Sequence, residues 1–220
     1  MTSLEFRDRL ARRARRAKAH LTLSMLGPLE AYFRLLAHWN ATINLTSLRL
    51  NEPSDEAFDR LLVEPLAAAR QIPDASKAWY DVGSGGGSPA IPLKIARPAL
   101  RLTMIESRER KAAFLREAIR TVGLAETTVL NERFEEVAGT SGNTGTADLV
   151  TVRAVKADPE LFMTAGLLLN AGGRLLLFRP AHDASADPPG FARVSTVLLT
   201  DAPPAYLSSY RRMFHVEQTR

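Results

Sequence analysis

The chain has 220 residues, of which 45% are hydrophobic and 24% are charged, and it contains no cysteine. This length suits one α/β domain with a short extension and is hardly enough for two full domains. The absence of cysteine excludes disulfides, thiolate metal sites and a cysteine nucleophile. Neither an apolar run of membrane-spanning length nor a secretory signal is visible, so we expect a cytoplasmic protein.

Basic residues crowd the start of the chain, although the formal net charge is only +5. Glu5 and Asp8 are the only acids that oppose them within the first twenty residues. Such a run either binds phosphates or forms a solvated or partly disordered N-terminal arm, and the sequence alone leaves both readings open. The basic residues are Arg7, Arg9, Arg12, Arg13, Arg15, Arg16 and Lys18.

Residues 1–50 are predicted to be largely helical, because apolar side chains recur there at three- and four-residue spacing. A second helix is predicted over residues 55–71, and Pro73 helps to end it. We expect residues 1–75 to form a helical extension that packs on a core of residues 76–220, as one compact unit. The apolar positions are Leu26, Leu29, Phe33, Leu36 and Ala37 in the first helix and Leu61, Leu62 and Leu66 in the second.

From residue 77 onward, strands and helices alternate, which predicts an α/β fold with a mostly parallel sheet between two layers of helices. Two late extended runs, residues 194–199 and 206–214, bring the predicted sheet to seven strands. Residues 139–146 and 181–190 are predicted loops. The earlier strands are predicted over 78–82, 101–106, 127–131, 148–152 and 174–178, and helices after Pro89, over 108–122, near Glu135 and over 158–169.

A glycine-rich loop follows the first of these strands and reads Asp81-Val82-Gly83-Ser84-Gly85-Gly86-Gly87. Glycines at 83, 85 and 87 let the backbone turn sharply and approach a ligand where a Cβ would clash. The loop leads into a helix, and open parallel sheets bind their ligands at the carboxyl ends of the strands. The loop therefore predicts a ligand site at that edge.

The spacing of the loop distinguishes three kinds of ligand. A dinucleotide fingerprint would need glycine where the chain has Ser88, and a phosphate loop would end in Gly-Lys-Ser/Thr, which is absent. The pattern Asp-x-Gly-x-Gly-x-Gly is typical of Rossmann-like methyltransferases of class I, whose cofactor has no phosphates. The carboxylate of Asp81 also suits a cofactor with an ammonium and a sulfonium group. We therefore predict S-adenosylmethionine as the cofactor.

Acidic and aromatic residues at the next strand ends extend this prediction. Glu106 ends the second strand, where a carboxylate can accept hydrogen bonds from both hydroxyls of a ribose. A solvated strand-end acid is the alternative, and Glu106 indicates a ribose site only together with the glycine loop. Phe134 and Glu135 follow the third strand, near the expected adenine, although a plain helix start explains them equally well.

The fourth predicted strand ends near Arg153, at the edge where methyltransferases place the reaction. The Asn/Asp-Pro-Pro-aromatic tetrad of enzymes that methylate exocyclic amines is absent there, and Asp187-Pro188-Pro189 occurs only in a later loop. Methylation of a cytosine carbon normally needs a cysteine, which the chain lacks. Arg153 is instead a fixed cation, either in the active site or in a salt bridge to a nearby acid.

Taken together, these stretches resemble the bacterial 16S ribosomal RNA guanine-N7 methyltransferases, also called the glucose-inhibited division protein B family. The resemblance covers most of residues 25–180. Its most specific parts are Asn44-Leu45-Thr46-Ser47 and the continuation of the glycine loop, Ser88-Pro89-Ala90-Ile91-Pro92-Leu93. Shorter matches are Trp39-Asn40, Glu106-Ser107 with Lys111 and Phe114-Leu115, Arg133-Phe134-Glu135-Glu136, and Val152-Arg153-Ala154.

The resemblance implies a transfer of the methyl group of S-adenosylmethionine to N7 of a specific guanine in 16S rRNA, with the small ribosomal subunit as partner. We predict Arg153 and Asn44 as catalytic residues, Thr46 and Ser47 near the pocket mouth, no metal, and no obligate protein partner. The resemblance implies cofactor contacts at Gly83, Ser88, Phe134, Glu135 and Arg153, with Glu106 at the ribose; the loop itself adds Asp81, Gly85 and Gly87.

On the substrate side the chain departs from the usual pattern of that family. The family often has a histidine and an Asp-Ser pair within the segment that is here residues 60–65. It usually has a glycine where Ala90 stands, and often Lys-Gly where this chain has Arg179-Pro180. These departures leave the cofactor motifs intact.

The predicted reaction is an in-line transfer to N7, whose lone pair is available without a general base. N-terminal arginines, with Arg211 and Arg212, would hold RNA phosphates. Three alternatives stay open: a methyltransferase for another RNA, a protein or a small molecule; a non-catalytic RNA-binding assembly factor with a vestigial cofactor fold; and an NAD-dependent oxidoreductase, which Ser88 disfavours. Binding of S-adenosylhomocysteine would argue against the second.

Overall fold

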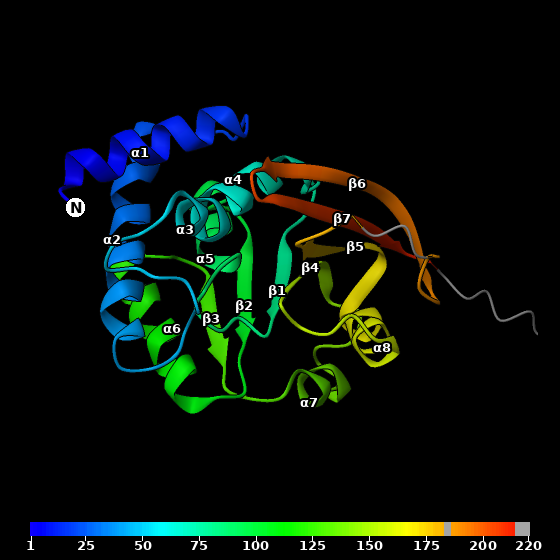
Figure 1. Ribbon diagram of the computed structural model, residues 1–220. Helices are drawn as coiled ribbons and strands as arrows, with labels where there is room; N and C mark the ends of the chain where they lie inside the picture. The colour runs from blue at the N-terminus through cyan, green and yellow to red at the C-terminus, as the bar shows by residue number, and fades with distance from the viewer. Residues whose placement is uncertain (183–185, 214–220) are drawn as a thin grey trace, which may run out of the picture.

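Seven strands form one sheet in the order β3-β2-β1-β4-β5-β7-β6 (Figure 1). The computed structural model describes residues 1–182 and 186–213. The first five strands in chain order are parallel to one another, and β7 runs antiparallel to both β5 and β6. The strands are β1 (Ala78–Val82), β2 (Arg101–Ile105), β3 (Thr127–Leu130), β4 (Ala147–Arg153), β5 (Leu169–Arg179), β6 (Phe191–Asp201) and β7 (Pro204–Arg212).

Helices cover both faces of this sheet, and two apolar clusters fill the spaces between them. Alternate residues of β4 serve the two clusters, because successive side chains of a strand point to opposite faces. Leu149 packs with α2, α5 and α6, whereas Val150 and Val152 pack with α7 and α8. The helices named here are α2 (Leu23–Asn40), α5 (Ala90–Ala96), α6 (Glu109–Val122), α7 (Phe134–Gly139) and α8 (Pro159–Leu168).

The predicted mostly parallel, seven-stranded α/β fold is therefore confirmed, with small differences at the ends of elements. The largest difference is β5, which starts at Leu169 rather than at residue 174. The predicted helix over 158–169 ends one residue earlier, because Leu169 pairs with Ala147 in the sheet and its carbonyl accepts a hydrogen bond from the side chain of Arg212. The parts of two predictions that fall on residues 183–185 and on Phe214 lie outside the described residues.

The basic N-terminal run is a folded helix, α1 (Ser3–Arg16), so the reading of it as a partly disordered arm is wrong. Thr2 and Glu5 form a capping box that satisfies the first N–H groups of the helix. Phe6 and Leu10 recur at helical spacing on its buried face, and the ring centroids of Phe6 and Phe33 lie 5.6 Å apart. Apolar burial on one face thus fixes α1 on the rest of the protein.

Several arginines of α1 bind acids of this chain. Arg9 pairs with Asp55 at 2.7 Å, and Arg13 forms a buried pair with Asp59. Arg16 reaches Asp201 on β6, with 3.0 Å between Nη2 and Oδ2. These arginines tie α1 to distant parts of the chain, and they are not a purely solvated run.

Residues 55–71 form one continuous helical segment, as predicted, but it contains a π-helical turn. We call residues 55–71 the helical segment. Wide π turns are rare and occur most often at functional sites. The parts of the segment are α3 (Asp55–Phe58), η1 (Asp59–Val63), α4 (Glu64–Ala68) and η2 (Ala69–Gln71).

The helices that precede the sheet share an apolar core with it, because one cluster contains both Phe58 and Leu102. The division of the chain into residues 1–75 and 76–220 stays a prediction. None of the helices in the described part of the chain is long and apolar enough to cross a membrane.

Candidate cofactor pocket

A cavity of about 450 Å³ lies at the carboxyl ends of β1, β2 and β4, where the glycine loop was expected to bind its ligand. One side is the glycine loop with Glu106, and the opposite side comes from the N-terminal helical region. The lining includes Thr46, Ser47, Glu56, Arg60, Leu61, Gly83, Ser84, Gly85, Gly86, Ser88, Glu106, Lys111, Arg153, Ala154 and Val155.

The glycine loop turns sharply after β1, as the sequence predicted. Gly83, Gly85 and Gly87 have φ angles of +68°, +50° and +82°, a region that side chains with a Cβ rarely adopt. The N–H groups of Gly83 and Ser84 both donate to the carbonyl of Ile105, which joins the loop to the end of β2. A Cβ on Gly83 would lie 2.8 Å from Cγ2 of Val155, so glycine at this position lets the loop pass close to Val155 at the pocket.

The N-terminal region holds this loop from the other side. The hydroxyl of Tyr32 on α2 donates to the carbonyl of Gly86 at 2.7 Å. A Cβ on Gly86 would lie 3.2 Å from the carbonyl oxygen of Leu45, so the 41–48 turn packs directly on the loop. Sequence reasoning missed Tyr32, because nothing in the spacing of its helix separates it from the other core positions.

Glu106 lies at the edge of the pocket and is only 7% exposed. Its Oε2 accepts a hydrogen bond from the N–H of Gly85, and its Oε1 accepts one from the N–H of Arg108, both at 2.9 Å. A carboxylate oxygen can accept more than one hydrogen bond, so both oxygens keep capacity for a ligand. Glu106 is thus held by backbone groups in a fixed orientation beside the loop.

Asp81 lies beneath the loop and does not line the cavity. It is 1% exposed; its Oδ1 accepts a hydrogen bond from the hydroxyl of Thr151, and its Oδ2 has no hydrogen-bond partner among the described residues. Burial raises the pKa of this carboxyl group to about 6. Because the side chain does not line the cavity, it influences a ligand there only electrostatically, through its charge.

Arg153 ends β4 and reaches into the pocket wall, where it forms the salt bridge that was one reading of it, while its part in the reaction stays a prediction. It lines the cavity, and it also pairs with Glu64 on the helical segment, with 2.7 Å between Nη2 and Oε2. Its guanidinium lies over the ring of Phe178, 4.4 Å from the centroid. Burial raises the pKa of Glu64 and lowers that of Arg153, while each partner's charge opposes the shift of the other.

The π turn explains why Arg153 bonds to the backbone there. Pro65 has no N–H, so the carbonyls of Arg60 and Leu61 lack the helical donor that would stand at that position. Side chains supply the missing donors: Nη1 of Arg153 donates to the carbonyl of Arg60, and Oγ of Ser88 donates to that of Leu61 at 3.0 Å. The helical segment is thereby attached to the glycine loop and to β4.

Besides Asp81, four predicted site residues do not line the cavity. Gly87 lies behind the loop, where a Cβ would meet Cδ1 of Ile91 at 2.6 Å. Phe134 and Glu135 open α7, beyond the end of β3, and Phe134 packs against the second apolar cluster. Asn44 is exposed in the 41–48 turn, next to Thr46 and Ser47, which do line the cavity.

Asn40 shapes that turn, a role that its place in the matching stretch does not by itself predict. Its Oδ1 accepts hydrogen bonds from the N–H groups of Leu45 and Thr46, both at 2.9 Å. Among the described residues, no group of acids and histidines is arranged to hold a metal ion.

Comparison with known proteins identifies the family. The model of the family described as rRNA small subunit methyltransferase G matches residues 25–186. This chain belongs to that family. Among similar curated proteins, ribosomal RNA small subunit methyltransferase G of Stenotrophomonas maltophilia (strain K279a) is 36% identical over 189 residues, which is 85% of each chain. The protein of the same name from Acidiphilium cryptum (strain JF-5) is 40% identical over 159 residues, 72% of this chain and 70% of its own.

Solved structures agree on the fold. A SAM-dependent methyltransferase from Aquifex aeolicus superposes with a TM-score of 0.56 at 14% identity, covering 70% of this chain and 93% of that one. TYW2 of P. horikoshii, solved in complex with MeSAdo, superposes with a TM-score of 0.52 at 13% identity, covering 68% and 63%. The predicted family, fold and enzyme class are confirmed, and these findings bear out S-adenosylmethionine as the cofactor.

Proposed function

We propose that this methyltransferase transfers the methyl group of S-adenosylmethionine to N7 of a guanine in the RNA of the small ribosomal subunit. One observation carries the proposal: the glycine loop and the Glu106 carboxylate face, across one cavity, the Thr46-Ser47 turn that is specific to the resembled family. The related proteins are named for action on small-subunit rRNA. An enzyme that acts on ribosomal RNA works where ribosomes are, so we expect it in the cytoplasm.

The residues of the pocket suit this cofactor. Glu106 keeps acceptor capacity for the ribose hydroxyls, and Gly83 lets the loop pass close to Val155, where a Cβ would clash. The negative charge of Asp81 lies below the loop, where it favours a cationic cofactor over an anionic one. We further propose that Phe134 and Glu135 flank the adenine, with Gly85, Gly87 and Ser88 shaping the loop around the rest of the cofactor.

The chain's own contribution to the reaction is positioning. S-adenosylmethionine, when bound, supplies an electrophilic methyl group on its sulfonium. N7 of guanine has an available lone pair, so the protein needs to hold the nucleophile in line and to exclude water rather than to remove a proton. We assign Arg153 to the fixed wall of the reaction site and Asn44, exposed beside Thr46, to the guanine that enters it.

Two further cations suit an RNA substrate. Arg60 and Lys111 line the cavity from opposite sides, one on the helical segment and one on α6. Cations at a pocket mouth attract the phosphates that flank a target base. N7 faces the deep, narrow major groove in an RNA helix, so we expect the target guanine in an open region or turned out of its stack.

A methylation assay tests this proposal. Purified protein is incubated with labelled S-adenosylmethionine and either 30S particles or 16S rRNA that lack the modification, and the nucleosides are then analysed by mass spectrometry. We expect a single 7-methylguanosine, and a Glu106→Gln variant that forms little of it. Methylation of another RNA, or of a protein, would refute the substrate assignment while keeping the enzyme class.

A calorimetric titration addresses the non-catalytic alternative. Binding of S-adenosylhomocysteine by the native protein, weakened in Glu106→Gln, supports a working cofactor site. A protein that binds rRNA but no S-adenosylhomocysteine would be an assembly factor with a vestigial pocket. Binding of NAD in its place would point to the oxidoreductase alternative.

A further inference from the structure

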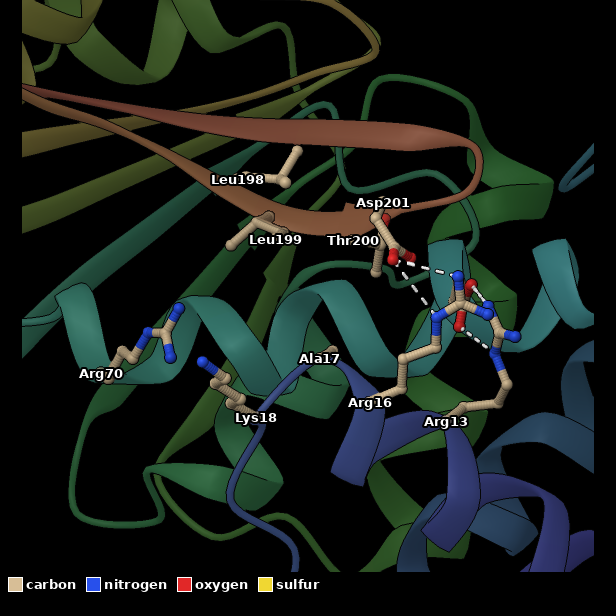
Figure 2. A pocket seen from close by; sticks show the side chains of 10 residues that line it. Arg13, Arg16, Ala17, Lys18, Arg70, Leu198, Leu199, Thr200 and Asp201 are labelled. Atoms are coloured by element: carbon tan, nitrogen blue, oxygen red, sulfur yellow. Dashed lines mark hydrogen bonds and ion pairs between the residues drawn. The ribbon is translucent and has the colours of Figure 1, made fainter.

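A second pocket, of about 280 Å³, lies between the end of α1, the end of the helical segment and β6 (Figure 2). It is distinct from the cofactor pocket, with which it shares no lining residue. The charged side chains that line it are Arg13, Arg16, Lys18 and Arg70, with Asp59 and Asp201 as the acids.

The charges of this second pocket divide into two halves. In one half, Arg13 pairs with Asp59 and Arg16 pairs with Asp201. In the other half, Lys18 and Arg70 turn their cationic groups toward one another (Figure 2), and neither side chain forms an ion pair or a hydrogen bond within the described residues.

Two cations that face each other in one pocket repel, and an anion between them would convert that repulsion into attraction. Both acids of the pocket are already engaged by other arginines. The unmatched half of the pocket therefore has the charge and the size to receive an anionic group from outside.

The backbone brings Lys18 to this place at a cost. Helix α1 ends in a motif in which the N–H of Lys18 donates to the carbonyl of Arg15 and that of Ala19 donates to the carbonyl of Ala14. The residue at the turn of this motif is usually glycine, but here it is Lys18, with φ +52°. A lysine is disfavoured in this conformation, so the backbone alone does not favour lysine over glycine here.

We propose that Lys18 and Arg70 form a binding site for a backbone phosphate of the RNA substrate, separate from the site of methyl transfer. This proposal rests on the proposed function, because it assigns the anion to the same RNA. The helical segment contributes Arg60 to the cofactor pocket and Arg70 to the second pocket, and ten helical residues span on the order of 15 Å. An RNA strand of a few nucleotides covers that distance.

The lining of this phosphate site lies largely apart from the region that identifies the family. Residues 13–18 and 198–201, which supply most of its lining, lie outside the part of the chain that the family model matches. On this proposal, the phosphate site is an RNA contact separate from the cofactor pocket.

Lys18→Gly and Arg70→Gln, alone and together, test the site. The glycine suits φ +52°, so the fold is retained while the charge is lost. Arg101→Gln is the matched control, because it removes one exposed positive charge at the amino end of β2, the opposite edge of the sheet. The affinity of each variant for unmodified 16S rRNA is measured by filter binding across a series of salt concentrations.

We expect each site variant to weaken RNA binding roughly fivefold to eightfold at about 0.1 M salt. In the double variant, the affinity for RNA should fall less steeply with salt concentration, by the amount that corresponds to the loss of about one to two phosphate contacts. The KM for RNA should rise, while kcat and the affinity for S-adenosylhomocysteine stay the same. Arg101→Gln should bind like the native protein.

The outcomes separate this proposal from the proposed function. If native protein methylates rRNA but the double variant binds RNA as Arg101→Gln does, the phosphate site is refuted and the function stands. If native protein binds 16S rRNA without methylating it, the proposed function fails while the site is still tested by binding. If the double variant no longer binds inorganic phosphate in calorimetry but keeps the native affinity for RNA, the pocket holds a free anion and the RNA assignment is overturned.

Discussion

The cofactor pocket has two walls that are built in different ways. The glycine-loop wall, residues 83–88 with Glu106, is held by backbone groups of neighbouring strand ends, such as the Gly83 N–H and the Ile105 carbonyl. The opposite wall, the helical segment, is held by side chains: Arg153 reaches Arg60 and Glu64 across 93 and 89 positions of sequence. The glycine-loop wall should therefore tolerate side-chain substitutions except where an added Cβ would clash. The helical wall depends instead on a few contacts of charged side chains.

The largest effect is expected in the helical wall, from Glu64→Gln. This variant leaves the buried guanidinium of Arg153 without its counter-charge, and breaking a buried pair in this way costs roughly 3–5 kcal/mol. The free energy of unfolding in urea measures the loss. A cost below about 1 kcal/mol, the range of exposed ion pairs, would show that the two walls do not differ in this respect.

Beneath the glycine-loop wall, Asp81 is expected to make the free energy of unfolding depend on pH in an unusual direction. Its folded pKa of about 6 lies above its ordinary value of 3.8, so the neutral form stabilises the fold. That stabilisation is complete below pH 3.8 and is lost as the pH rises through about 6, for a total of about 3 kcal/mol. Most carboxylates act in the opposite direction.

Asp81→Asn isolates this contribution. The difference in unfolding free energy between the variant and the native protein should grow in favour of the variant from pH 4 to pH 7, since an amide oxygen can still accept the hydrogen bond from Thr151. A constant difference over that range would mean that Asp81 is not buried as an acid with a raised pKa.

A comparison of two glycines tests whether an added Cβ disturbs the glycine-loop wall. Gly83 and Gly123 have nearly the same φ, +68° and +74°, but only a Cβ on Gly83 meets another residue. Changing either to alanine should cost roughly 1–2 kcal/mol of stability through backbone strain. Gly83→Ala should in addition lose most of its affinity for S-adenosylhomocysteine in calorimetry, whereas Gly123→Ala keeps it. Equal affinities in the two variants would remove Gly83 from the cofactor site.

The smallest effect is expected outside both walls. Asp201→Asn breaks the ion pair with Arg16, whose side chains are each more than half exposed. We expect only a small loss of stability in urea unfolding, far below that of Glu64→Gln, and a smaller one still at high salt. A loss as large as that of Glu64→Gln would mean that α1 is held mainly by its charges and not by Phe6 and Leu10.

Most of the glycine-loop wall could be predicted from the sequence. The turn at Gly83, Gly85 and Gly87 and the place of Glu106 depend on local backbone geometry, which a short motif encodes within a few residues. The strand that ends at Val82 was predicted to the residue for the same reason. Phe134 and Glu135 were predicted near the adenine, and their role stays a prediction.

The helical wall could not be predicted in this way. The sequence cannot decide whether Arg153 belongs to the active site or to a salt bridge, because its partner Glu64 is far away in the sequence. The missing N–H of Pro65 is visible in the sequence, but the donors that replace it, from Ser88 and Arg153, are known only once the chain is folded.

By itself, the sequence determined the α/β class, the ligand edge of the sheet and the resemblance to a family of rRNA methyltransferases. Each of these follows from periodicity or from a motif of adjacent residues. Only the tertiary structure decided that the N-terminal arginines fold into a packed helix, and that Lys18 and Arg70 meet without an acid between them. The physical reason is that charge pairing acts through space, so it depends on which distant residues the fold brings together.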